Sequence, residues 1–259
     1  MKTTLSFLLA CMSLSVLGQS QLYVLNEGRF DWNNGVIAEA PSLGVIDLAT
    51  SSYAQIASFD SIAFATDLEV QGGHGYVCLE NTVMKVDLAT GDVLAEVELE
   101  GAQELALLDD KVYVTRGGLD QVTWGPLDLE SHLAWLSADD LSLEGALPLA
   151  SGPQYACQAI CVHNGLVVVG VNNGWVWGEE VGLVGTFDPA SGSYTEVDLG
   201  DTGKNPVALH EVNGAVLSVN NGDWSSTSVS RVVAGETLEA STEVLTDVAA
   251  GCNASAVVS

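Results

Sequence analysis

The sequence predicts an all-β fold built from one supersecondary unit that repeats along the chain. Short segments rich in β-branched residues, each bounded by Gly, Asp or Asn, follow one another from residue 22 onward, and no amphipathic helix pattern of useful length interrupts them. The same order of segments returns roughly every 40 to 55 residues. Asp47, Asp87 and Asp188 mark one equivalent position in three of these units. Four short antiparallel strands in a unit of this length are typical of a β-propeller blade.

Residues 75–117 show the unit most clearly. The strands expected there are 76–79, 83–88, 93–99, 104–108 and 112–115. Equivalent second strands are expected within 22–28, 75–81, 112–118, 166–174 and 215–222. Equivalent third strands with their exit turns are expected within 44–53, 85–93, 135–143, 185–194 and 230–238. The propeller domain, 19–259, therefore divides into about five blades, near 21–60, 61–101, 102–152, 153–203 and 204–251, and one further strand at 252–259.

The last strand leaves two interpretations open. In one, residues 252–259 complete the first blade and so remove the open edge of a five-bladed ring. In the other, the chain is a fragment of a larger propeller of about seven blades. We favour the fragment, because the sequence stops where a turn and another strand would normally follow.

The first eighteen residues have the pattern of a secretory signal peptide. Lys2 precedes an apolar stretch, and small and polar residues follow it, so cleavage is expected after Gly18. A lipoprotein signal at Cys11 is the alternative, which the bulky Leu9 disfavours. No later stretch approaches the roughly 20 apolar residues that span a bilayer. The sequence predicts a secreted protein that is extracellular, cell-surface or periplasmic, without membrane insertion.

The chain is strongly acidic, with 34 Asp and Glu against 7 Lys and Arg. A field of this sign repels phosphate backbones and anionic lipid, so nucleic acid is not expected as a partner. Solubility in a salty medium, where charges are screened, explains the acidity better than a cationic partner does. The hydrophobic content of 47% is ample for a folded core.

Four cysteines remain after export, and none of them has metal-ligand spacing. Cys157 and Cys161 are expected on one face of a strand, too far apart to bridge each other. A disulfide between Cys157 and Cys252 is open if their strands become neighbours.

Residues 75–117 resemble the YVTN-type β-propeller repeat. The stretch VYVTRGG, 112–118, carries the tyrosine-valine-threonine core of that signature, with Arg116 where the family usually has asparagine. The opening LYVLNEGRFDWNNG behind a signal peptide is similar to secreted propellers of Bacteroidota-type bacteria. These motifs are structural, so the resemblance implies a fold and a compartment but little chemistry.

Five of the six tryptophans fall between a second and a third strand. In a propeller these connections emerge on the face that also carries the links between blades, which we call the connection face. One hypothesis is a ligand site of aromatic and acidic side chains there, because exposed aromatic surface is costly unless it is used. The candidate ligand-binding residues are Trp175, Trp177, Glu179, Glu180, Trp32, Trp224 and His210. The competing interpretation is that the tryptophans pack between blades and that Asn-Gly pairs only supply the positive φ of tight turns.

Enzyme chemistry has little support in the sequence. No nucleophile elbow, metal-ligand spacing or phosphate loop occurs, so no catalytic residue, metal or cofactor is predicted. His74 and His163 fall at turns, where exposed side chains are expected. His210, in a first strand, is the best single candidate for a functional histidine.

Two cofactors have only partial signals in the sequence. The Asp-x-x-Thr-Gly of 87–91 is similar to pyrroloquinoline-quinone propeller repeats, but Val93 and Leu94 stand where those repeats carry tryptophan. Calcium at DWNNG or NNGDW would have oxygen ligands but would lack the closing bidentate glutamate of known loops.

The sequence therefore predicts a secreted, non-catalytic propeller that acts as a binding or scaffold module for protein, peptide or glycan. The alternative is a propeller lyase or hydrolase with its site in the central channel, where a group such as His210 would meet a carboxylate of the connection face.

Overall fold

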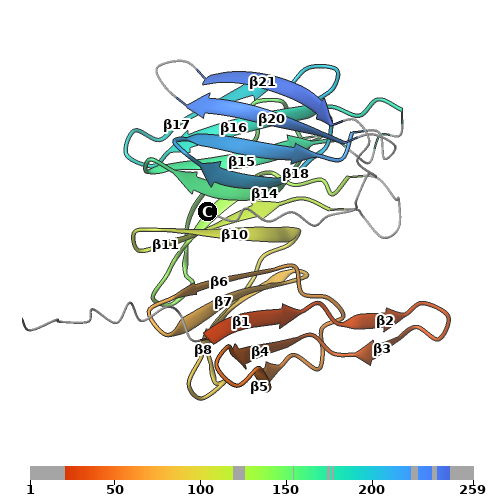
Figure 1. The fold of residues 1–259 in the computed structure, drawn as a ribbon, viewed down its shortest axis with the longest axis vertical. Coiled ribbons are helices and arrows are strands. Elements are labelled where there is room, and N and C mark those ends of the chain that lie inside the picture. Colours follow the sequence, from red (N-terminus) through yellow and green to blue (C-terminus); the bar gives the residue numbers. More distant parts are fainter. Residues whose placement is uncertain are drawn as a thin grey trace, which may run out of the picture.

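The computed structural model of the chain describes residues 21–118, 126–153, 155–173, 176, 178–222, 227–234 and 238–245. Within these ranges the chain forms twenty-one β-strands and no helix (Figure 1). The all-β prediction is thereby confirmed. None of the described residues belongs to a helix that is long and apolar enough to cross a membrane.

Five antiparallel sheets and one separate hairpin account for these strands. The first sheet contains β1 (Gln21–Asn26), β4 (Ser42–Asp47) and β5 (Ser52–Ser58). The second contains β6 (Asp67–Gln71), β7 (His74–Leu79), β8 (Thr82–Asp87) and β9 (Val93–Glu98). The third contains β10 (Ala102–Leu108), β11 (Lys111–Arg116), β12 (Leu133–Ser137) and β13 (Leu143–Leu147). The fourth contains β14 (Ala156–His163), β15 (Leu166–Asn172), β16 (Gly182–Asp188) and β17 (Ser193–Asp198). The fifth contains β18 (Pro206–Val212), β19 (Ala215–Asn220), β20 (Thr227–Ala234) and β21 (Leu238–Leu245). The hairpin consists of β2 (Arg29–Asp31) and β3 (Val36–Glu39).

The order of strands in each sheet is the order in the chain, as a propeller blade requires. The strands expected within 75–117 are β7 to β11, each within two residues of its expected start. The first sheet has three strands among the described residues, with β1 at its edge. The strand expected at 252–259 lies outside the described residues. In Figure 1 the sheets follow one another in sequence order, from the first sheet at the bottom to the fifth at the top.

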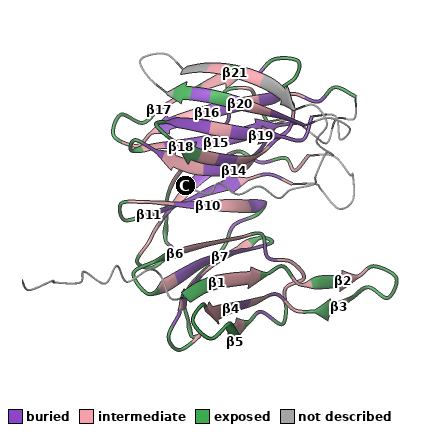
Figure 2. Ribbon diagram, in the orientation of Figure 1, coloured by how far each residue is buried: buried purple, intermediate pink, exposed green. Residues whose placement is uncertain are grey.

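The hydrophobic core is divided among the spaces between successive sheets. One cluster, around Leu43 and Val77, joins the first and second sheets, and another, around Cys78 and Val114, joins the second and third. Two further clusters join the third sheet to the fourth and the fourth to the fifth. Figure 2 accordingly shows the buried segments along the strands of the stacked sheets, whereas the β2–β3 hairpin is mostly exposed. Each sheet is therefore stabilised by its neighbours in the stack.

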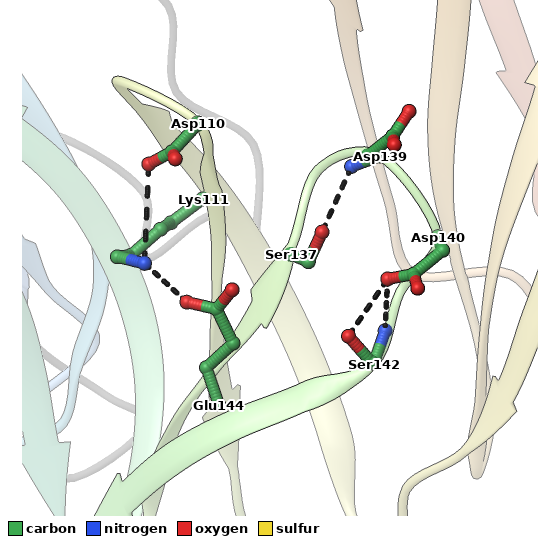
Figure 3. A network of polar contacts seen from close by, with 7 residues as sticks. All are labelled: Asp110, Lys111, Ser137, Asp139, Asp140, Ser142 and Glu144. Atoms are coloured by element: carbon green, nitrogen blue, oxygen red, sulfur yellow. Dashed lines mark hydrogen bonds and ion pairs between the residues drawn. The ribbon is translucent and has the colours of Figure 1, made fainter.

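The turns after the third strands of the first four sheets are built in a similar way. The carboxylate of Asp87 accepts hydrogen bonds from the backbone N–H groups of Ala89 (2.8 Å) and Thr90 (3.0 Å). Asp47 and Asp188 cap their turns with the same geometry. In the third sheet the Ser137 hydroxyl takes this role toward Asp139, at 3.2 Å (Figure 3). The repeated aspartate of the sequence is therefore a turn cap.

Two expectations about single residues were wrong. Cys157 and Cys161 do not share a face of β14, because a bulge between Cys157 and Ile160 reverses the alternation of side chains. Cys157 packs in the cluster toward the third sheet, whereas Cys161 packs in the cluster toward the fifth. His163 is not an exposed turn residue: it is 2% exposed, and its Nδ1 lies 3.6 Å from Oε1 of Glu211.

The cysteines are free thiols in the described part of the chain, where Cys78 and Cys157 are buried. Burial raises the pKa of the Cys78 and Cys161 thiols to about 12, so neither is a ready nucleophile. The pairing of Cys157 with Cys252 stays a prediction, because Cys252 lies outside the described residues.

Candidate functional site

The connection face forms where the links between blades meet the connections between second and third strands. Ala65, in the link that enters the second sheet, donates its backbone N–H to Glu27 O at 2.8 Å. Gly117 donates in the same way to Gly101 O at 2.7 Å, and Gly222 to Lys204 O at 2.9 Å. Links and connections therefore lie side by side around one end of the inner strands, as the sequence predicts.

An exposed aromatic cluster stands on this face. Trp32, at the tip of the β2–β3 hairpin, is 69% exposed. Its ring meets Phe30 edge to face, with centroids 4.8 Å apart, and lies nearly parallel to Phe64, with centroids 6.2 Å apart. Phe64 belongs to the link between β5 and β6, so two segments of the chain build the cluster. We call Phe30, Trp32 and Phe64 the aromatic cluster.

The turn that carries Trp32 is held by its own side chains. Oδ1 of Asp31 accepts hydrogen bonds from the backbone N–H groups of Asn33 (2.9 Å) and Asn34 (3.2 Å), and Oδ2 accepts one from Asn34 Nδ2 (2.6 Å). These bonds lower the pKa of Asp31. Gly35 follows at φ 68°, which closes the turn. At the base of the hairpin an ion pair joins Arg29 to Glu39 at 2.8 Å.

A cavity of about 580 Å³ lies at the connection-face end of the inner strands. Side chains from all five sheets or the links that lead into them line it: Tyr23, Leu25, Glu27, Ala65, Thr66, Asp67, Leu68, Gln103, Glu104, Gln158 and Val207. Carboxylates and carboxamides supply most of its polar groups, and no Lys, Arg or His is among these lining residues. The cavity is therefore acidic, and Glu27 and Ala65 place it next to the aromatic cluster.

Two of the cavity carboxylates also hold the sheets together. Oδ2 of Asp67 in β6 accepts a hydrogen bond of 2.7 Å from the backbone N–H of Leu105 in β10. Glu104 in β10 repeats the contact one blade later, with Oε2 3.2 Å from the backbone N of Ile160 in β14. Leu105 and Ile160 each end a β-bulge, which leaves a backbone N–H without a partner in its own ladder. Asp67 and Glu104 therefore accept hydrogen bonds from the backbone N–H groups that the bulges of the next sheet leave unpaired.

Burial raises the pKa values of this acidic group. The pKa of Glu104 rises to about 8, because its carboxylate is desolvated and lies near Asp67. Glu69, which follows Asp67 on the same face of β6, has its pKa raised to about 7 by the same two causes. Burial also raises the pKa of Asp67, against the opposing effect of its hydrogen bonds. Glu104 therefore carries a proton at neutral pH, and Glu69 carries one for part of the time.

The predicted site at Trp175 and Trp177 is described only in part. Both tryptophans lie outside the described residues, as does Trp224. Glu179 is exposed, but Glu180 is 6% exposed and its Oε1 accepts a hydrogen bond from the Gly178 N–H at 3.0 Å. In the described part of this connection, Glu179 is therefore the carboxylate available to solvent.

The Asn-Asn-Gly stretches of the fourth and fifth sheets serve the fold, as Asn34 and Gly35 do in the hairpin turn. Asn173 Oδ1 accepts from Val181 N at 2.7 Å and its Nδ2 donates to Glu179 O at 3.1 Å, which closes the loop between β15 and β16. Asn220 is fully buried and donates to the hydroxyls of Ser228 and Ser230. The competing interpretation of these motifs as repeat punctuation is therefore supported for the fourth and fifth sheets.

The two tryptophans within the described residues lie in different environments. Trp135 packs between the third and fourth sheets and stacks on Phe187, with ring centroids 5.1 Å apart. Trp32, in contrast, keeps most of its surface in solvent. Among the candidates named from the sequence that are fully described, Trp32 best fits a ligand contact.

The histidine expected in the channel does not line the cavity. His210 is half-buried in β18, in register with Leu217 of β19, and is not among the cavity residues. No group of three or more His, Cys, Asp or Glu among the described residues is arranged to hold a metal ion. A histidine–carboxylate pair at the cavity is therefore not formed by His210.

Some residues of the site were missed in the sequence. Phe30 and Phe64 were not named, although Phe30 alternates with Trp32 beside an Asn-Gly turn, which is a hairpin signal. Asp67 and Glu104 were not named either. Asp67 immediately precedes Leu68 in β6, and Glu104 immediately precedes Leu105 in β10; β6 and β10 are the first strands of the second and third sheets. A comparison of these two strands would have shown an acidic residue at the same position.

Comparisons with known proteins bear on the fold. No protein-family profile matches the sequence, and no curated protein is significantly similar to it. The crystal structure of BamB from Moraxella catarrhalis is similar to this chain, with a TM-score of 0.51 and 15% sequence identity. The similarity covers 80% of this chain and 61% of that one, so the chain spans less than two thirds of the length of this neighbour. At this identity the likeness concerns the fold alone. Four-stranded antiparallel sheets in sequence order, together with this likeness, identify the fold as a β-propeller with about five blades in this chain.

Proposed function

We propose that this chain is a secreted, non-catalytic β-propeller that acts as a binding or scaffold module for protein, peptide or glycan. The observation that carries the proposal is the aromatic cluster, in which Trp32 is 69% exposed on a hairpin at the connection face. Large exposed aromatic side chains usually mark interaction sites, because leaving them in water is costly.

The position of the cluster supports the same proposal. Ligand sites are concave and combine apolar surface with a few polar groups. Here the cluster supplies the apolar surface, and the neighbouring cavity, lined by Glu27, Asp67 and Glu104, supplies the polar groups. Secretion rests on the pattern of residues 1–18, and the exclusion of nucleic acid rests on the net charge of −27.

A binding screen with point variants tests this function. The full chain is applied to arrayed glycans and peptides, in parallel with Trp32→Ala. We expect at least one class of ligand to bind, with affinity falling about tenfold in the variant, since a lost aromatic contact costs about 1.4 kcal/mol. Trp175→Ala and Trp177→Ala are included because the sequence also proposes these residues.

Leu143→Ala is the matched control. Leu143 is 57% exposed at the start of β13, next to the turn after β12, which lies at the end of the sheet opposite the connection face. Its loss should leave binding unchanged. Equal binding by the parent protein and all three tryptophan variants would contradict the proposal, as would an effect of Leu143→Ala as large as that of Trp32→Ala.

One observation favours the alternative, a lyase or hydrolase with its site at the channel. Glu104, with a pKa of about 8, is protonated at neutral pH and has the properties of a general acid. Its hydrogen bond to Ile160 gives it a structural role, which accounts for its position without catalysis. If Glu104→Gln abolished turnover of a glycoside or ester while Trp32→Ala left it intact, the enzyme would be supported instead.

A further inference from the structure

The tip of the β2–β3 hairpin presents an aromatic surface beside a single carboxylate, that of Asp31. Phe30 meets Trp32 edge to face and Phe64 lies nearly parallel to it, so the orientation of the indole ring is defined by two neighbours. Oxygens of the Asp31 carboxylate accept three hydrogen bonds from the turn. Arg29 is paired with Glu39. A ligand that meets Trp32 therefore encounters an aromatic ring, the amides of the turn and one carboxylate, Asp31, whose oxygens already accept hydrogen bonds from the turn.

The net charge of the chain limits the ligand further. At −27 the molecule repels anionic polymers and anionic membrane surfaces. A cationic ligand would be drawn to the many exposed carboxylates of the surface and would not need the aromatic cluster. An aromatic surface whose one carboxylate is engaged by its own turn, on an acidic body, favours a ligand that binds by ring stacking and hydroxyl hydrogen bonds and not by charge.

The size of the cluster argues against a protein partner at this point. A stable protein interface buries about 800 Å² on each side. Three aromatic side chains bury at most about 150–250 Å² each, and Phe30 and Phe64 are already half-buried. The remaining surface is of the size of one or a few sugar rings.

We propose that the aromatic cluster is a binding site for a neutral polysaccharide, whose sugar rings stack on Trp32. This inference rests on the proposed binding function and names its ligand class. The face of a pyranose ring with axial C–H groups is apolar and flat, and it matches the exposed face of the indole. The exposed carboxamide of Asn33, next to Trp32 in the turn, can donate to and accept from the hydroxyl groups at the ring's edge.

Native affinity electrophoresis provides a direct test. The acidic protein migrates readily toward the anode, so binding to a soluble neutral polysaccharide in the gel appears as retardation. Separate gels contain hydroxyethyl cellulose, galactomannan, xylan or, as the anionic counterpart, alginate. We expect retardation by at least one neutral polymer and none by alginate.

Variants assign the retardation to the cluster. Trp32→Ala should weaken binding about tenfold, and Phe64→Ala should weaken it less, since Phe64 only orients the indole. Trp32→Tyr keeps an aromatic face and should restore most of the binding. Leu143→Ala, on the outer strand β13, should migrate like the parent. Circular dichroism of each variant shows whether it is folded.

Several results would overturn the inference. They are the absence of retardation in every neutral gel, retardation by alginate as strong as by the neutral polymers, and unchanged retardation in Trp32→Ala. Binding of Trp32-dependent peptides or phosphatidylcholine vesicles without any polysaccharide would also overturn it. That last result would contradict the polysaccharide site but would still support the proposed binding function. If no ligand in the glycan and peptide screen depended on a tryptophan, both the binding function and the polysaccharide site would be contradicted.

Discussion

At the scale of single residues, the carboxylates fall into two groups with opposite pKa shifts. The exposed turn caps accept backbone hydrogen bonds in their charged form, which lowers their pKa values; these are Asp47, Asp87 and Asp188. The carboxylates at or beside the cavity are desolvated, which raises their pKa values; these are Asp67, Glu69 and Glu104. The two groups therefore give stability opposite dependences on pH.

The turn caps predict a loss of stability in acid. The pKa of Asp87 is lower in the folded chain than in the unfolded chain, so its contribution is complete above the unfolded value and is lost as pH falls through the folded value. Asp87→Ala should lower the urea midpoint at neutral pH and reduce the acid sensitivity below about pH 4. Glu98→Ala, which removes an exposed carboxylate from the same sheet, should change neither. Equal midpoints for Asp87→Ala and the parent would contradict the capping role.

Glu104 predicts the opposite trend at higher pH. Its pKa rises from 4.5 in the unfolded chain to about 8 in the folded one, so the folded state binds the extra proton between these values. The stabilisation is complete below about pH 4.5 and is lost as pH rises through about 8. Glu104→Gln keeps an oxygen for Ile160 but does not titrate, so its urea midpoint should fall less between about pH 5 and pH 9 than that of the parent. An identical pH profile would show that Glu104 is not desolvated.

At the scale of elements, one lysine joins two sheets. Lys85 in β8 is buried, and its Nζ donates to the carbonyl oxygens of Ala138 and Asp139, both at 2.9 Å, in the turn after β12. The hydroxyl of Tyr76 donates to the same Ala138 oxygen at 2.8 Å. The turn that follows β12 is therefore attached to the second sheet as well as to its own.

Two lysine variants separate this contact from a surface ion pair. Lys85→Met should lower the free energy of unfolding by about 2 kcal/mol, because two hydrogen bonds from a charged donor are lost. Lys111 is the matched lysine: it pairs with Glu144 and with Asp110, whose side chain is 86% exposed (Figure 3). Lys111→Met should leave the unfolding curve almost unchanged, since exposed pairs contribute little. Similar urea curves for the two variants would argue against the inter-sheet role of Lys85.

Glycines beneath aromatic rings are a second structural feature that the sheets share. Gly185 in β16 lies under the ring of Tyr194 in β17, and a Cβ there would overlap that ring. Gly44 lies in the same way under Tyr53, and Gly145 under Trp135. These glycines leave space for a large cross-strand aromatic residue.

The variant Gly185→Ala tests this packing. The added methyl group should displace Tyr194, break its hydrogen bond of 2.8 Å to Glu196, and cost about 1–3 kcal/mol in the free energy of unfolding. In a Tyr194→Ser background the same change should cost much less, because the ring is gone. Denaturant unfolding of the four proteins in this double-mutant cycle gives the coupling; additive costs would exclude the ring as the cause.

At the scale of the whole molecule, stability is a sum of contacts between neighbouring sheets. Among the described residues, the second, third and fourth sheets have a core cluster on each side, whereas the first and fifth sheets have one each. In keeping with this, β15 is buried along most of its length and β5 is largely exposed. Repeat architectures of this kind open most easily at sheets with few neighbours.

Hydrogen exchange measures whether the first sheet opens more easily than the fourth. We expect the backbone amides of β15 to exchange far more slowly than those of β4 in the middle of the first sheet, although both strands are paired on two sides. Proteolysis should likewise begin in the first sheet. Equal protection of β4 and β15 would mean that the molecule opens only as a whole.

The sequence by itself determined the repeat, its strands and its turns. Strand identity follows from local side-chain pattern, and a turn such as 87–91 needs only its own aspartate and glycine, so both are readable without tertiary information. The exposed Trp32 was also named in advance, because its Asn-Gly turn places it in a connection.

Only the tertiary structure decided which side chains meet. The stacking of Phe64 on Trp32 joins two segments that are separate in sequence, and the pairing of Asp67 with Leu105 joins two blades. One extra residue in β14 reversed the face of Cys161, and no periodicity shows a bulge in advance. Burial of Glu180 and His163 likewise depends on neighbours from other parts of the chain. Contacts between distant residues depend on how sheets pack and not on local preference, and for this reason the sequence predicted the blades of this propeller better than its site.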